Sequence, residues 1–129
     1  MKKTFTKEEK KEYFKSLREQ WQASKKLADN DETAKALHRE AGSNYSYYSF
    51  YFTLLAMREQ NLEGIPYVDC KTFNKWKEAG FKVIKGEKSK VKGLTWIHPV
   101  NKEGEELEDM IYPKTYHLFH KTQVEELVK

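Results

Sequence analysis

Several features are scarce or missing in the sequence, and each absence argues against a class of protein. Cys70 is the only cysteine among 129 residues, so an internal disulfide cannot form and a reducing compartment is favoured. No long apolar run is present, so we predict neither a signal peptide nor a membrane span and expect a cytoplasmic protein. A chain of this length suits a single domain, residues 1–129, with its own core.

Motifs for catalysis and metal binding are also missing. The sequence contains no Gly-x-Ser-x-Gly elbow and no P-loop, and no motif marks Cys70 as a nucleophile. None of the histidines has the i, i+4 pairing with a glutamate that hydrolytic zinc sites use. His117 and His120 are spaced so that they lie on opposite faces of a predicted strand. We therefore expect no enzyme activity, no metal site and no cofactor.

What the sequence does contain is segregated charge. The net charge is +4, but residues 71–92 hold eight lysines and two glutamates, whereas residues 101–109 hold one lysine and five acidic residues. A basic segment beside an acidic one produces a directional electrostatic field, and such fields usually attract polyanions.

Helical patterns dominate the first half of the chain. Thr6 and Glu9 form a capping box, and the apolar spacing that follows predicts a helix over residues 7–27. Asp29 or Asp31 is positioned to cap a second helix, which Gly42 ends. The third helix is expected over residues 45–57, which are apolar on every side and should be the most buried.

Strand patterns follow in the second half. We expect a short strand at residues 67–68, a helix over 71–79, an extended arm at 81–84, a turn at 85–87, and a hairpin of residues 91–100 and 115–120 around the acidic loop 101–109. A capping box of Thr122 and Glu125 predicts a closing helix through Val128. The fold class is therefore α+β, with N-terminal helices packed on a small antiparallel sheet that has a β-hairpin and a short C-terminal helix.

Four stretches, in order, resemble the N-terminal domain of ArdC-like antirestriction proteins. They are Tyr48-Ser49 leading into Leu54-Leu55 and Gln60; Trp76 with Gly80; the run from Val83 to Lys88; and Tyr116 with Phe119 and Gln123. The match spans residues 45–126, and residues 1–44 form a helical extension that the family does not share. Phe52 stands where the family tends to place an asparagine. The resemblance implies non-catalytic, non-sequence-specific binding of single-stranded DNA in a mobile-element process such as replication, transfer or antirestriction.

The candidate DNA-binding residues combine cations with aromatic rings. Lysines neutralise phosphates and release counterions, and rings stack on bases, which contributes roughly 1–3 kcal/mol per base. We call residues 82–92 the lysine segment and expect it to line one groove with the strand that carries Trp96, while Trp96 and Tyr48 stack on bases. The candidates are Tyr45, Tyr48, Lys82, Lys85, Lys88, Lys90, Lys92, Trp96 and His117.

The basic run and the aromatic residues around the candidates also have structural interpretations. A lysine-rich edge also prevents sheets from aggregating. Tyr47, Phe50, Tyr51 and Phe52 are expected in the core, as are Trp21, Trp76 and Phe119. The rival function is a protein-interaction adaptor, in which the lysine segment docks an acidic replication, restriction or transfer protein encoded nearby and DNA is incidental.

Overall fold

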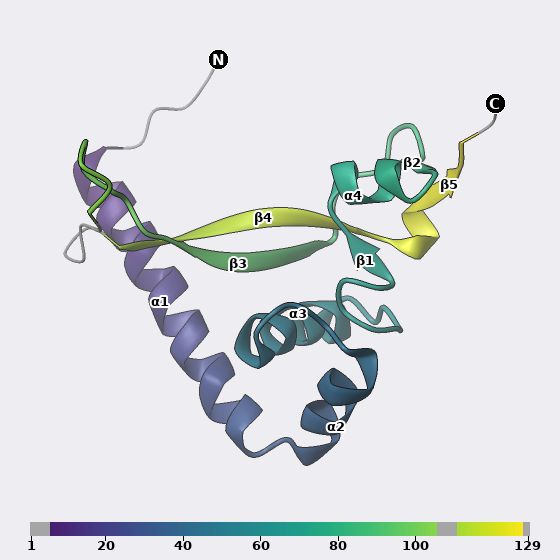
Figure 1. The fold of residues 1–129 in the computed structure, drawn as a ribbon, viewed down its shortest axis with the longest axis horizontal. Helices are drawn as coiled ribbons and strands as arrows, with labels where there is room; N and C mark the ends of the chain where they lie inside the picture. The colour runs from purple at the N-terminus through teal and green to yellow at the C-terminus, as the bar shows by residue number, and fades with distance from the viewer. Residues whose placement is uncertain (1–5, 106–110, 128–129) are drawn as a thin grey trace.

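Three helices precede the strands in the computed structural model, which describes residues 6–105 and 111–127 (Figure 1). Thr6 caps the first helix by accepting the Glu9 N–H at 3.1 Å, and Asp31 caps the second by accepting the Ala34 N–H at 3.0 Å. Gly42 ends the second helix in the left-handed conformation, at φ 60°. The three predicted helices are thereby confirmed, as α1 (Lys7–Asp29), α2 (Glu32–Ala41) and α3 (Tyr47–Glu59).

The predicted hairpin supplies two of the strands of a three-stranded antiparallel sheet. The hairpin strands are β3 (Val91–Ile97) and β4 (Tyr112–His120), and the strand order is β1-β4-β3, with β4 in the centre and β1 at Cys70–Lys71. Val91 lies opposite Leu118, and Ile97 lies opposite Tyr112. Of the acidic loop expected between the strands, residues 106–109 lie outside the described residues.

A second, two-stranded sheet pairs β2 (Phe81–Val83) with β5 (Val124–Glu126), and α4 (Phe73–Glu78) precedes it. In Figure 1 these elements lie together at one end of the hairpin. The predicted turn after β2 is confirmed by the Glu87 N–H, which donates to the Ile84 carbonyl at 3.0 Å, and by Gly86 at φ 91°. The α+β class predicted from the sequence is thus the class of the structure.

One local prediction is wrong, and the C-terminal helix is present but shorter than predicted. Tyr67 and Val68 lie in a turn rather than a strand, and Tyr67 has φ 66°, a left-handed conformation outside the β region. At the C-terminus the short helix is one 3-10 turn, Lys121–Gln123, and the next three residues form β5 instead of continuing as a helix. The reason is the edge of β2, whose backbone groups need a partner strand. Val128 lies outside the described residues.

The capping box at this C-terminal turn also differs from the prediction. His120 and Gln123 form it, rather than Thr122 and Glu125: the His120 side chain accepts the Thr122 N–H, and the Gln123 side chain accepts the His120 N–H at 3.0 Å. The turn is therefore tied to the end of β4.

Within the described residues the core consists of three clusters; α3 supplies buried residues to two of them, and its half-buried Phe52 packs against the third. One cluster joins α3 to α1 and α2, a second joins it to the sheet, and the third packs α1 on the hairpin. The prediction that α3 is the most buried helix agrees with its side chains: Phe50, Tyr51, Thr53, Leu54 and Met57 are all buried. Trp21 and Trp76 are buried as predicted. No helix in the described part of the chain is long and apolar enough to cross a membrane.

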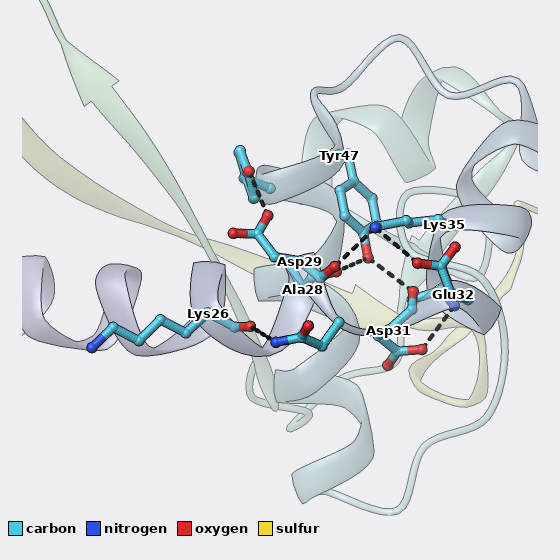
Figure 2. A network of polar contacts seen from close by, with 10 residues as sticks. Lys26, Ala28, Asp29, Asp31, Glu32, Lys35 and Tyr47 are labelled. Carbon is cyan, nitrogen blue, oxygen red and sulfur yellow. Dashed lines mark hydrogen bonds and ion pairs between the residues drawn. The ribbon is translucent and has the colours of Figure 1, made fainter.

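The tyrosines of α3 also bind the junction between α1 and α2 (Figure 2). The Tyr47 hydroxyl donates to the Ala28 carbonyl at 2.7 Å, and the Tyr48 hydroxyl donates to the Asp29 carboxylate at 2.7 Å. A helix leaves its last carbonyls without intrahelical partners, so the Tyr47 hydroxyl supplies one of these partners, while Tyr48 binds a side chain at the same helix end. Burial and the nearby Asp31 charge raise the pKa of Tyr47 to about 12, which keeps its hydroxyl a donor.

Candidate nucleic-acid interface

The lysine segment runs from β2 through the turn into β3. Lys85, Lys88, Lys90 and Lys92 are exposed, and none of these four makes an ion pair with another described residue. Lys82 differs, because its ammonium lies 3.5 Å from the Glu125 carboxylate across the β2–β5 pair. The four lysines of residues 85–92 therefore carry the uncompensated charge of the segment.

Gln123 fixes the backbone of the lysine segment. Its side chain is fully buried and donates to the Lys88 carbonyl at 2.6 Å, and its own carbonyl accepts the Ile84 N–H at 2.9 Å. The Ser89 hydroxyl is within hydrogen-bond distance of the Leu118 carbonyl of β4, at 2.7 Å. The segment is thus held on both sides of its turn while its lysine side chains face water.

Lys90 and Lys92 lie at the rim of a groove of about 570 Å³ between α1, α3 and the start of β3. The groove lining is mixed: it includes apolar Leu17, Leu27 and Leu55 and also polar side chains such as Glu59. Leu27 is 56% exposed, so its side chain is accessible to a partner in the groove.

His117 lies across the hairpin from the basic end of β3. It is opposite Lys92 in the β3–β4 register and is exposed, so the two side chains share one face of the hairpin. The sequence-based placement of His117 beside the lysines agrees with this register.

Trp96 and Tyr48 lie in contacts between elements. The Trp96 ring packs edge-on against Trp21 of α1, with ring centroids 6.0 Å apart. The Tyr48 ring lies 5.0 Å from the Lys25 ammonium, and its hydroxyl is bound by Asp29. Both rings are half-buried and engaged by other elements, which argues against the predicted stacking role.

Tyr45 is the predicted stacking residue with the most open ring. It is 40% exposed and lies face to face with Tyr67, with centroids 3.6 Å apart and an interplanar angle of 8°. Both rings line a second hollow, of about 550 Å³, together with Lys71 and Lys75. Sequence reasoning did not select these two lysines, although they begin the basic stretch of residues 71–92, because the pattern placed them on a short helix.

The residues that carry the family resemblance have structural roles around the two basic regions. The Trp76 indole N–H donates to the Phe119 carbonyl at 2.7 Å, which joins α4 to β4. The Tyr116 hydroxyl is hydrogen-bonded to the Tyr67 hydroxyl, and burial raises the pKa of both groups. These contacts position β4 and the turn that carries Tyr67.

The described residues hold no group of three or more His, Cys, Asp or Glu side chains that could bind a metal ion. His120 is buried, and its imidazole Nε2 donates to the Glu63 carbonyl at 2.6 Å. Burial raises the pKa of the Cys70 thiol to about 12, so it stays protonated at neutral pH.

No protein family, no curated protein and no solved structure matches this chain. The similarity to ArdC-like domains stays a prediction from the sequence.

Proposed function

We propose that the protein binds single-stranded DNA without sequence specificity, in a mobile-element process such as replication, transfer or antirestriction, and that it is not an enzyme. One observation carries the proposal: four exposed lysines of residues 85–92 make no ion pair with another described residue, and their backbone is anchored by a buried glutamine. Lysines held in this way neutralise phosphates without first breaking ion pairs, and the counterions they displace favour binding.

The exposed ring of Tyr45 favours a single strand over a duplex. Unpaired bases are free to stack on aromatic side chains, whereas the bases of a duplex stack on one another. The distribution of charge indicates at which end of the hairpin the DNA binds. Glu103 and Glu105 belong to the loop at the far end of the hairpin from β2 (Figure 1). DNA is therefore expected at the end that carries the lysine segment.

The test compares two variants with the same change in net charge. The first carries Lys85→Glu, Lys88→Glu and Lys90→Glu; the control carries Lys7→Glu, Lys10→Glu and Lys11→Glu, on exposed positions at the far end of α1 (Figure 1). We expect the first variant to bind a fluorescent oligo-dT about 100-fold more weakly at low salt, with a flattened salt dependence, and the control to lose far less. Equal losses in both variants, or unchanged affinity of a folded first variant, would contradict the proposal.

A protein-interaction adaptor is the second candidate, and the groove between α1, α3 and β3 favours it. Exposed Leu27 and the rim lysines Lys90 and Lys92 would suit an amphipathic segment with acidic flanks from a replication, restriction or transfer protein. Leu27→Asp tests whether DNA occupies this groove, because it adds a charge beside the groove's apolar residues and leaves the lysines unchanged. Loss of DNA binding in a folded Leu27→Asp variant would place the DNA in this groove, whereas retained DNA binding leaves the groove free for a protein.

A further inference from the structure

The hollow beside Tyr45 has the size and the lining of a small-molecule site. It measures about 550 Å³, within the ordinary range of such sites, and lies between the residues before α3, the turn before β1, and α4. Its lining includes an open aromatic ring at Tyr45, an amide at Asn44, a hydroxyl at Thr72, and the charged side chains of Lys71, Lys75 and Glu78.

The Tyr45 ring is held in place before any ligand arrives. Tyr67 covers one face of the ring, and the Tyr67 hydroxyl is itself hydrogen-bonded to Thr53 Oγ1 at 2.9 Å and to the hydroxyl of Tyr116. The backbone of Tyr45 is fixed too, because the Nε2 of His38 donates to its carbonyl at 2.8 Å. A fixed ring loses little conformational entropy when a ligand stacks on it.

The charge of the hollow favours an anion. Lys71 and Lys75 supply two cations against the single carboxylate of Glu78, and the Lys75–Glu78 pair, at 3.4 Å, is exposed and weak. The Lys71 ammonium lies 5.0 Å from the Trp76 ring centroid, which holds it near the hollow without neutralising it.

We propose that this hollow binds one nucleotide, with its base stacked on Tyr45 and its 5′-phosphate between Lys71 and Lys75. Asn44 offers both a donor and acceptors to a base edge. The Thr72 oxygen accepts the Lys75 N–H at 3.3 Å, so its own hydrogen stays available to a ligand oxygen. The nucleotide is either the 5′-phosphorylated end of a DNA strand or a free nucleoside monophosphate; the first source rests on the proposed function, and the second does not.

Calorimetric titration with thymidine 5′-monophosphate and with thymidine tests the site. We expect the monophosphate to bind and thymidine to bind about ten-fold more weakly, since it lacks the charge that the lysines recognise. Tyr45→Leu, which keeps an apolar side chain, should weaken the monophosphate about ten-fold, the loss expected for one stack. Tyr13→Leu is the matched control, because Tyr13 is also an open tyrosine, 46% exposed, but lines the other groove.

A second variant addresses the phosphate separately. Lys71→Gln with Lys75→Gln should remove the preference for the monophosphate over thymidine while the affinity for thymidine stays unchanged. No binding of the monophosphate at low salt would overturn the proposal. So would wild-type affinity in folded Tyr45→Leu, with folding checked by circular dichroism and by Tm.

The two sources of the nucleotide are separated with an oligo-dT that carries either a 5′-phosphate or a 5′-hydroxyl. If the hollow takes the end of a strand, the wild type prefers the phosphorylated oligonucleotide and Tyr45→Leu loses this preference. If it takes a free nucleotide, the wild type and Tyr45→Leu both bind the two oligonucleotides without preference for the phosphorylated one, while Tyr45→Leu still weakens the monophosphate.

Failure of this inference can be told apart from failure of the proposed function. An oligo-dT that binds through the lysine segment, with no binding of the monophosphate, removes the nucleotide site and leaves the DNA-binding proposal intact. Binding of the monophosphate to a protein that does not bind oligo-dT removes the DNA-binding proposal and retains the site.

Discussion

Gln123 connects the stability of the fold to the position of the lysine segment. Its buried side chain donates to the Lys88 carbonyl and accepts the His120 N–H. Gln123→Leu keeps the size of the side chain but leaves both backbone groups without this partner. Because a buried polar group without a partner costs about 1–3 kcal/mol, we expect the free energy of unfolding in urea to fall by about that amount.

The control for this variant is Glu126→Gln, an exposed substitution on β5 that should leave the free energy of unfolding nearly unchanged. Gln123→Leu should also weaken DNA binding, since the lysine segment loses an anchor. Wild-type stability in Gln123→Leu would show that the segment is held by other contacts.

Gly93 is required by the ring of Tyr116. The two residues are opposite each other in the β3–β4 register, and a Cβ on Gly93 would collide with the Tyr116 ring. Because its hydroxyl is bound to Tyr67, the ring cannot move away freely. We expect Gly93→Ala to lower the free energy of unfolding by about 1–3 kcal/mol, as overpacking does.

A double-mutant cycle checks the cause of this loss. In a Tyr116→Ala background the collision is absent, so adding Gly93→Ala should cost much less than it does in the wild type. Equal costs in both backgrounds would mean that the glycine is needed for another reason.

At the scale of single residues, the sequence predicted which side chains are exposed better than it predicted which side chains contact one another. The lysines of residues 85–92 are exposed as expected, because charge alone determines that preference. The partner of the Trp96 ring is Trp21, on a distant helix, and no local pattern indicates that pairing. The same holds for the stacking of Tyr45 on Tyr67, which the sequence did not predict.

At the scale of the elements, the junction of α1, α2 and α3 depends on Asp31. Its carboxylate accepts the Ala34 N–H at 3.0 Å and the Tyr51 hydroxyl at 3.1 Å, and lies 3.5 Å from the Arg58 guanidinium. The Ala34 N–H is the main cause of a pKa below the usual value for Asp31, and the tyrosine and the arginine lower it further. The folded state therefore favours the charged carboxylate.

Asp31→Asn tests this charge, because asparagine also caps helices but does not ionise. The stabilisation by the charge is present above the unfolded pKa, about 3.9, and is lost as the pH falls through the lower folded pKa. We expect the wild type to be more stable by up to about 1 kcal/mol at neutral pH, since the arginine pair is exposed. Urea unfolding at neutral pH and near pH 3 measures the difference; a difference that does not shrink in acid would contradict this role.

Helices whose ends carry capping or stop residues were predicted well, whereas elements that form only against a distant part of the chain were not. The caps at Thr6 and Asp31 and the stop at Gly42 are local signals, and they placed the first two helices. The strand at Val124–Glu126 forms because β2 offers an unpaired edge, which is visible only when distant residues meet. The turn at Tyr67 likewise depends on hydroxyl contacts with Thr53 and Tyr116.

At the scale of the whole molecule, charge is separated along the hairpin. The lysine segment lies next to β2 and α4 at one end, and Glu103 and Glu105 lie in the loop at the other (Figure 1). Such a field steers a polyanion toward the basic end and orients it there. The order of the helical and strand patterns in the sequence predicted the fold class. The position of Tyr45 near the basic end results from packing, which those patterns do not show.

The most direct test of single-stranded DNA binding is a titration of a fluorescent oligo-dT of about 30 nucleotides at two salt concentrations, with a duplex of the same length as competitor. We predict tight binding that weakens steeply as salt rises and that the duplex fails to compete. Absence of binding at low salt would contradict single-stranded DNA binding and favour the adaptor, and equal competition by the duplex would contradict the preference for a single strand.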